Sequence, residues 1–327
     1  MRTLSPLGAT LALCLALAPA ARAETEIKIA TLAPRGSVWM QVLNKMKAMV
    51  AQQTKGEVKL HFYPGQVQGD EVDVVRKMRT GQVHGGAFTT VGLQQLNPKV
   101  LVLQIPTLFV DYALLDRVRD QLRAELEATF LEKGYVLLGW GEIGKIYLFS
   151  KNKIGSLKEI AKQKVWAWTD DPLPKAMLRA LGVSPRLLGV PQVLPGLNTG
   201  IIDTVYTSPY GCMALQWHTK VKYMLDASFG VANGATVITK AVFDKLTPEQ
   251  QKILRTLADK AHRVLIKRIR QDNDKALETL KAEGLEVVQV SEADKQAFRK
   301  AATAVGLSFV PRYYPKELYD KVLKLAK

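Results

Sequence analysis

The 327-residue sequence is poor in cysteine, in catalytic motifs and in long apolar runs beyond its N-terminus. Its two cysteines, Cys14 and Cys212, exclude a disulfide-rich scaffold and a metal cluster held by several thiolates. The four histidines form no i, i+4 pair and have no carboxylates at zinc-site spacing, so each is interpreted as a strand, loop or helix-surface residue. The sequence also lacks a G-x-S-x-G elbow, a phosphate loop and a dinucleotide fingerprint. We therefore expect no enzyme, no metal and no cofactor.

Two weak catalytic patterns have ordinary structural explanations. Cys212 precedes His218 by six residues, which suggests a nucleophile and base, but a small buried cysteine is the commoner case. The acidic pair Asp170 and Asp171 precedes Pro172 and is typical of a helix cap.

The composition is that of a globular protein with a large excess of positive charge. Hydrophobic residues make up 47% and charged residues 23%, and the length suits about two domains. The 46 basic and 30 acidic residues give a net charge of +16, which raises the question of nucleic-acid binding. The basic residues fall mainly on helix faces without interleaved aromatic residues, so solvated surfaces are the favoured explanation and no nucleic-acid partner is expected. The residues predicted to be exposed in this way are Arg263, Lys267, Arg268, Arg270, Lys295, Arg299, Lys300, Lys316, Lys321, Lys324 and Lys327.

The N-terminus has the pattern of an export signal. Arg2 precedes an uncharged stretch with an apolar centre over 11–17, and Ala21-Arg22-Ala23 forms an A-x-A cleavage site. A retained membrane anchor is the alternative, but the strongly apolar part is short for a span. We predict that residues 1–23 are removed, which takes away Arg2 and Arg22 and lowers the charge to +14. The mature protein is then expected in the periplasm, without a disulfide or a membrane span.

Short apolar runs alternate with helical patterns along the rest of the chain, which predicts an α/β fold. Strands are predicted over 27–30, 58–63, 85–89, 135–140, 145–150, 164–168, 186–188, 202–206 and 235–239. Helices are predicted from Ser37 to near Gly56, over 69–80, over 111–133 and over 173–181. A further helix begins at Thr247, where Pro248 and Gln250 complete a capping box, and extends to Gly284.

That last helix is unusually long for a compact domain and suits two lobes that share a spine. We predict one lobe from 24–144 plus about 231–262. The second lobe is predicted from 145–230 plus about 263–327.

Several stretches, in order and spacing, resemble a known family. They are Gly65, Gly69-Asp70-Glu71, Gly81-Gln82-Val83, Ile105-Pro106-Thr107-Leu108-Phe109, Leu197-Asn198-Thr199-Gly200-Ile201-Ile202-Asp203 and Phe243 to Gln251. Together they resemble the extracytoplasmic solute-binding proteins of TRAP transporters, the DctP family, over nearly all of the mature chain. The resemblance implies a periplasmic-binding-protein-like fold with a ligand cleft between two lobes and a long helix that spans both. It also implies a small organic solute as ligand and a membrane partner with one small and one large subunit.

The sequence departs from the family pattern at the expected ligand site. Family members usually carry an arginine in a G-L-K-x-R-V-P strand, where the guanidinium holds a ligand carboxylate. The matching segment here is Gln163 to Trp168, which places Trp166 at the position of the arginine. Tryptophan offers an apolar face and one N–H instead of a five-donor cation. A second basic family position falls near Lys145, and a polar position after the third strand falls at Thr89.

The resemblance therefore predicts a cleft that is rich in aromatic residues. The candidate ligand-binding residues are Trp166, Trp168, Lys145, Thr89, Tyr206, Ser208, Tyr210 and Trp140. For Trp140 and Tyr210, packing in the core is an equal alternative. The hypothesis is a ligand with apolar or aromatic surface, with Lys145 available for a carboxylate. Two other functions stay open at this point: an exported enzyme on a similar two-lobed scaffold, and a basic surface that binds anionic lipid or polymer.

Overall fold

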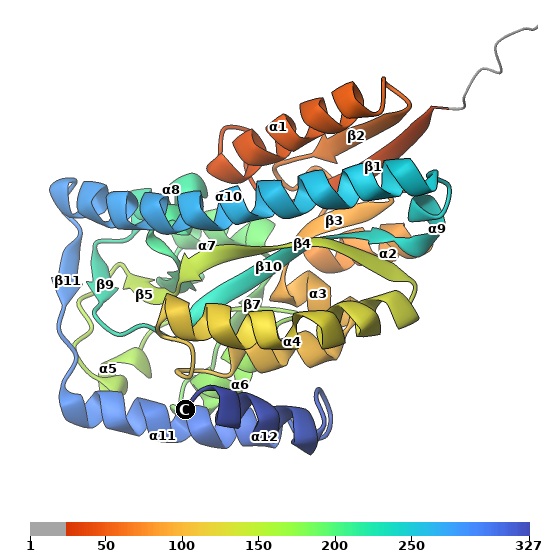
Figure 1. Cartoon of the computed structure of the whole chain (residues 1–327). Helices are drawn as coiled ribbons and strands as arrows, with labels where there is room; N and C mark the ends of the chain where they lie inside the picture. Colours follow the sequence, from red (N-terminus) through yellow and green to blue (C-terminus); the bar gives the residue numbers. More distant parts are fainter. Residues whose placement is uncertain (1–23) are drawn as a thin grey trace, which may run out of the picture.

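The computed structural model describes residues 24–327 and contains two α/β lobes (Figure 1). The predicted signal peptide lies outside the described residues. The first lobe is built on a five-stranded sheet in which β1 pairs in parallel with β2 and β3, while β10 is antiparallel to β3 and β4. In sheet order the strands are β2 (Val58–Tyr63), β1 (Thr25–Thr31), β3 (Gly85–Thr89), β10 (Val231–Thr239) and β4 (Tyr135–Lys145).

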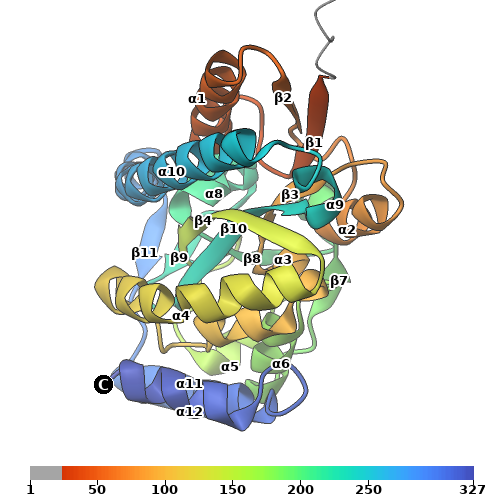
Figure 2. The same cartoon turned by 45° about the vertical axis from the view of Figure 1, so that its right-hand side comes forward.

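Helices cover both faces of this first sheet, as the rotated view also shows (Figure 2). They are α1 (Val38–Gln53), α2 (Glu71–Arg79), α3 (Thr90–Leu96), the 3-10 helix η1 (Pro98–Gln104), α4 (Tyr112–Glu132) and α9 (Lys240–Phe243). One face buries apolar residues of β1 and β2 against α1, for example Ile27 and Leu60 against Leu43. The other face packs on α4 and η1, where Phe130 and Leu101 are fully buried.

The second lobe has a smaller sheet in which β5 is antiparallel to both of its neighbours. Its strands, in sheet order, are β11 (Glu286–Val288), β9 (Tyr223–Leu225), β5 (Tyr147–Ser150) and β8 (Thr204–Thr207), and a separate parallel pair is formed by β6 (Trp166–Trp168) and β7 (Arg186–Leu188). The helical elements are α5 (Leu157–Ile160), α6 (Pro172–Ala180), η2 (Val190–Gln192), α7 (Val193–Thr199), α8 (Pro209–Ala214) and η3 (Trp217–Lys220). Its core contains Phe149, Val205 and Cys212, and the burial of Cys212 confirms the prediction of a core cysteine.

The helix α10 (Pro248–Ala282) runs across both lobes in the upper part of Figure 1, beneath α1. Its 35 residues and its capping box of Thr247 and Gln250 confirm the sequence prediction. Near its start Leu254 packs in the core of the first lobe, and near its end Leu280 packs in the core of the second. Among residues 24–327, no helix combines the length and the apolar character that a membrane span requires.

Within residues 24–327 the chain crosses between the lobes at three places: from β4 to β5, from β9 to β10, and along α10. The first two crossings run side by side, because Ile146 N donates a hydrogen bond to Gly230 O at 2.9 Å and Phe229 N donates to Ile146 O at 2.9 Å. Gly144 and Gly230 flank this junction with φ of 114° and 122°, a backbone region that favours glycine. The two strands therefore form a paired bridge beneath the long helix.

The C-terminal helices α11 (Glu292–Ser308) and α12 (Lys316–Leu325) lie along the bottom of Figure 1. Phe298 of α11 and Leu318 of α12 share a hydrophobic cluster with α4 and η1 of the first lobe and with Met177 of α6 in the second. The C-terminal segment thus contacts both lobes.

Three sequence predictions were wrong in detail. The predicted strands over 135–140 and 145–150 are a β4 that continues to Lys145 and a short β5, because β10 pairs along all of β4 and accommodates two register shifts. Arg270 was predicted on an exposed helix face, but its side chain is only 21% exposed because it pairs with Glu142 and Asp116. His262 is also buried instead of lying on the helix surface, since it faces the sheet and contacts Thr236.

Candidate functional site

Two adjoining chambers occupy the space between the lobes. The first chamber encloses about 910 Å³ and the second about 1030 Å³, each volume including its opening to solvent. Both chambers are bounded by Thr89, Ile143, Trp168 and Thr207, which we call the partition. Thr89 and Ile143 come from the first lobe, whereas Trp168 and Thr207 come from the second. The chambers are therefore two parts of one cleft between the lobes.

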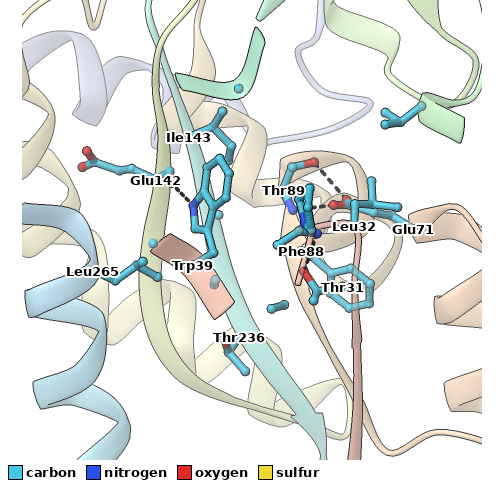
Figure 3. Close-up of a pocket in the computed structure, with 18 of the residues that line it drawn as sticks. Thr31, Leu32, Trp39, Glu71, Phe88, Thr89, Glu142, Ile143, Thr236 and Leu265 are labelled. Atoms are coloured by element: carbon cyan, nitrogen blue, oxygen red, sulfur yellow. Dashed lines mark hydrogen bonds between the residues drawn. The ribbon is translucent and has the colours of Figure 1, made fainter. Parts of the chain in front are cut away.

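The first chamber lies against the central sheet of the first lobe (Figure 3). Apolar side chains from several elements line it, among them Trp39 of α1, Phe88 of β3 and Leu265 of α10. The indole N–H of Trp39 donates to the backbone oxygen of Glu142 at 3.1 Å, so the ring is fixed with its polar atom already bonded. Gly141 and Gly234 pair on neighbouring strands in its wall. A Cβ on Gly141 would meet no atom closer than 3.7 Å, whereas a Cβ on Gly234 would lie 2.5 Å from the backbone oxygen of Phe88.

The carboxyl group of Glu71 is buried in the wall of the first chamber. It accepts hydrogen bonds from Thr89 N at 2.8 Å, Thr89 Oγ1 at 2.9 Å and Gly92 N at 2.7 Å. Burial raises the pKa of Glu71 to about 8, although these hydrogen bonds favour the ionised form. Glu71 thus fixes the end of β3 and the start of α3, and with them Thr89.

His262 contributes a neutral imidazole to the same wall. Its Nδ1 lies 2.7 Å from the backbone oxygen of Ala258, which can only accept, so Nδ1 carries the proton. Nε2 then accepts the hydroxyl proton of Thr236 at 2.8 Å. Burial also lowers the pKa of His262, which agrees with the neutral form.

The second chamber is lined by apolar side chains of both lobes and by one buried carboxyl group. Ile105 and Phe109 approach from the first lobe, and Met177 of α6 from the second. Asp171 caps α6 by accepting a hydrogen bond from Leu173 N at 3.2 Å through Oδ1, which confirms the predicted helix cap. Its side chain lies in the wall of the chamber, and burial raises its pKa to about 7.

No lysine or arginine among residues 24–327 lines either chamber. The ionisable residues in the described walls are instead the carboxylic acids Glu71, Glu142 and Asp171, the histidine His262 and the tyrosine Tyr206. Glu142 directs its carboxylate away to two arginines: Arg119 at 2.8 Å and Arg270 at 2.6 Å. The described residues therefore place no fixed cation in the cleft to hold a ligand carboxylate.

Hydrogen bonds across the mouth of the cleft hold the lobes together. Asp70, the N-cap of α2, accepts from Trp168 Nε1 at 2.9 Å and from Val190 N at 3.1 Å through Oδ2. Gln94 of α3 donates to the backbone oxygen of Asp170 at 2.9 Å. We call the hydrogen bonds made by Asp70 to Trp168 and Val190 the latch. Because Trp168 also belongs to the partition, one side chain joins the latch to the ligand space.

Three of the eight residues proposed from the sequence line the cleft. Trp168 and Thr89 border both chambers, and Tyr206 borders the second. The hydroxyl of Tyr206 accepts a hydrogen bond from Trp168 N at 3.1 Å, so these two aromatic residues are fixed together.

Two others, Trp166 and Lys145, lie outside the walls of both chambers. The ring of Trp166 stacks on Tyr206 with centroids 4.6 Å apart and packs edge-on against Trp217, so it supports the wall from behind. The ammonium group of Lys145 lies 5.1 Å from the centre of the Tyr112 ring.

The remaining three, Ser208, Tyr210 and Trp140, also lie outside the chamber walls. Ser208 caps α8. The Tyr210 hydroxyl accepts from Val38 N at 2.8 Å. Trp140 lines a separate groove with residues of α4 and α10. The ligand contacts assigned to all eight residues stay predictions.

Sequence reasoning missed several wall residues. Glu71 was noted only as part of a helix start, Asp171 only as a cap, and Trp39 only as part of a helical apolar stripe. Ile143 lies in the segment that was wrongly left between two strands. A possible signal was the unusual pairing of Asp70 and Glu71 at one helix start, where a single capping side chain suffices.

Comparisons with known proteins agree with this architecture. Residues 29–310 match the family model DctP, "Bacterial extracellular solute-binding protein, family 7". The chain is 26% identical over 263 residues to the 2,3-diketo-L-gulonate-binding periplasmic protein YiaO of Escherichia coli, covering 79% of this chain and 78% of that one. It is 22% identical over 272 residues to the C4-dicarboxylate-binding periplasmic protein DctP of Rhodobacter capsulatus, covering 80% and 79%.

Solved structures show the same fold. A TRAP periplasmic solute-binding protein of Haemophilus influenzae with bound L-gulonate has a TM-score of 0.86 at 20% identity, covering 93% of this chain and 100% of that one. One from Ralstonia eutropha with bound (S)-2-acetolactate has a TM-score of 0.85 at 22% identity, covering 92% and 98%. With the family model matched over most of its length, this chain belongs to the DctP family of bacterial extracellular solute-binding proteins.

Proposed function

We propose that this protein captures an organic solute that lacks a carboxylate and has substantial apolar surface, and that it delivers this solute to a TRAP-type membrane transporter. Family membership and the two-lobed fold support the solute-binding role. The transporter partner, with one small and one large membrane subunit, follows from the names of the structural relatives and from the sequence resemblance. We also propose that residues 1–23 are removed on export and that the mature protein works in the periplasm, as the names of YiaO and DctP state for those relatives.

The single observation that carries the ligand assignment is the absence of lysine and arginine from the chamber walls in the described part of the chain. The relatives named above bind gulonate derivatives, dicarboxylates or acetolactate, all of which are carboxylates. A carboxylate that enters an apolar cleft without a cation would lose its hydrogen bonds to water and would gain no ion pair to offset that cost. The partition residue Trp168 instead offers an aromatic face, and apolar walls favour an apolar solute.

Lobe closure is the proposed mechanism of capture. The paired bridge at Ile146 and Gly230 lets the lobes rotate, while α10 keeps them aligned. The latch forms only when Asp70 of the first lobe meets Trp168 and Val190 of the second, so closure also covers the solute. We propose that the protein performs no chemistry on its ligand, because Glu71, Glu142 and His262 in the chamber walls are bonded to other groups of the protein.

Isothermal titration calorimetry of the mature protein tests this assignment. The panel pairs neutral aromatic alcohols with L-gulonate, succinate and galacturonate, and each titration is repeated at low and high salt. We expect the neutral solutes to bind with an affinity that is nearly independent of salt. Tight, salt-sensitive binding of any of the three acids would refute the assignment, and chemical alteration of a bound solute, seen by mass spectrometry, would indicate an enzyme.

A further inference from the structure

The two chambers differ in what they offer to a ligand, and this difference defines the shape and polarity of the solute. Resting on the function proposed above, we propose that the ligand is elongated and lies across the partition. Its apolar end occupies the first chamber, and a hydroxyl or amino group at its other end donates a hydrogen bond to Asp171 in the second.

The polar groups of the first chamber are nearly all bonded within the protein. Glu71 accepts three hydrogen bonds, and the hydroxyl of Thr89 donates to it while accepting from Val91 N. The hydroxyl of Thr236 donates a hydrogen bond to Nε2 of His262, and Nδ1 of His262 donates one to the backbone oxygen of Ala258. A cavity whose polar groups are already hydrogen-bonded within the protein is suited to an apolar part of a ligand, because it offers a polar group few new hydrogen bonds.

The second chamber contains a hydrogen-bond acceptor with spare capacity. Asp171 is only 7% exposed, and its Oδ1 is taken by Leu173 N. Within residues 24–327 no hydrogen bond engages Oδ2. This oxygen is open to the solvent space of the chamber, so a donor group on the ligand can bond to it there. Tyr206 lies in the same wall and fixes Trp168 beside it.

The partition makes a single ligand across both chambers possible. Thr89, Ile143, Trp168 and Thr207 border both volumes, so the chambers meet along these four side chains. No hydrogen bond engages the hydroxyl of Thr207 in the described part of the chain, which leaves it available to the middle of a ligand. The apolar walls on either side then hold the two ends.

Two strand positions allow each chamber to be filled separately. A Cβ on Gly141 would lie 3.7 Å from Leu265 Cδ2, an ordinary contact, so Gly141→Val projects into the first chamber without a backbone clash. Ala232 of β10 lines the second chamber and is partly exposed, so Ala232→Leu fills that chamber instead. Asp171→Asn keeps the helix cap, because the amide oxygen can accept from Leu173 N, but then presents an N–H₂ donor to the chamber.

The experiment measures calorimetric affinities at about pH 8.5, where Asp171 is ionised, of phenylbutanol, phenylbutylamine, phenylbutyrate and the short benzyl alcohol for the wild-type protein and the three variants. For the wild type we expect phenylbutanol and phenylbutylamine to bind about tenfold or more tightly than phenylbutyrate and benzyl alcohol. Gly141→Val and Ala232→Leu should each weaken phenylbutanol about tenfold. Asp171→Asn should weaken the alcohol about tenfold and the amine further, while it leaves phenylbutyrate unchanged or tighter.

Each contrary result has a definite meaning. If only one filled chamber weakens binding, the ligand occupies one chamber and the inference is wrong. If both fillings weaken binding but Asp171→Asn changes no probe, the donor contact is wrong while the proposed solute-binding function stands. If the wild type binds none of the probes, or neither filling affects any of them, the inference fails. In the latter case the assignment of this cleft as the solute site fails too.

Discussion

Gly189 offers a way to open the latch without altering either lobe. It precedes η2 with φ of −73° and ψ of 160°, a conformation that any residue can adopt. A Cβ at this position would lie 2.5 Å from Asp70 Oδ2 across the cleft. Since Cβ contacts under 3.0 Å essentially never occur, Gly189→Ala must displace that oxygen by at least 0.5 Å in the closed protein.

The consequence for closure can be estimated from the two latch bonds. Displacement along the bonds would lengthen them from 2.9 and 3.1 Å to about 3.4 and 3.6 Å, at or beyond the limit of a useful hydrogen bond. Hydrogen bonds to charged groups contribute about 1.5–3 kcal/mol each when fully formed. Asp70 is partly exposed, so we take about 1.5–3 kcal/mol for the pair, which lowers the ratio of closed to open protein roughly 10- to 100-fold.

Electron spin resonance between labels on the two lobes measures this ratio. Cysteines replacing the exposed Lys47 and Lys158 can be labelled selectively, because Cys212 is fully buried. We expect Gly189→Ala to shift the distance distribution toward the open form with an unchanged unfolding midpoint. The control is Gly155→Ala in the same lobe, whose Cβ would lie 3.6 Å from the Glu159 carboxylate. Wild-type closure in Gly189→Ala, or equal opening in both variants, would refute the latch.

Three further predictions concern the charge network, the indole of the latch and the buried acid. Arg270→Met should lower the free energy of unfolding, measured in urea, by about 3–5 kcal/mol, because it deprives the fully buried Glu142 of a partner. The control Arg263→Met removes an exposed ion pair and should cost under about 1 kcal/mol. Equal losses in the two variants would contradict this prediction. Trp168→Phe keeps an aromatic face but loses the N–H that donates a hydrogen bond to Asp70. The affinity for phenylbutanol, measured by calorimetry, should therefore fall about tenfold. An unchanged affinity would show that this hydrogen bond does not contribute to binding. Burial raises the pKa of Asp171 from 3.8 to about 7, so between these pH values the folded protein holds a proton there that the unfolded chain releases. The stability of the wild type relative to Asp171→Asn should therefore fall as the pH rises from about 4 to 7. Thermal melts that show no such trend would mean that this carboxyl group is exposed to water.

Much of the fold was predictable because its signals are local. The caps at Ser37 and Thr247 involve side chains within three residues of the backbone groups they bond, and both are confirmed. The length of α10 followed from its caps and apolar stripe. The extent of β4 was not predictable in this way, because the pairing with β10 that continues it comes from residues about ninety positions later.

The site was less predictable because its contacts join distant residues. The tryptophan at Trp166 indicated an aromatic cleft, but only the fold shows that Tyr206 and Trp217 cover it while Trp168 borders both chambers. Arg270 has the sequence pattern of an exposed helix residue, and its burial depends on Glu142, 128 positions away. The bond from Trp168 to Asp70 spans 98 positions and leaves no trace in local sequence.

The central claim is that this cleft holds a solute without a cationic clamp for a carboxylate. Native mass spectrometry of the mature protein, purified without refolding and followed by release and identification of any bound small molecule, tests it most directly. We predict a molecule that lacks a carboxylate, has an apolar body and carries a hydroxyl or amino group at one end. A released uronate, dicarboxylate or other carboxylate ligand would contradict the claim.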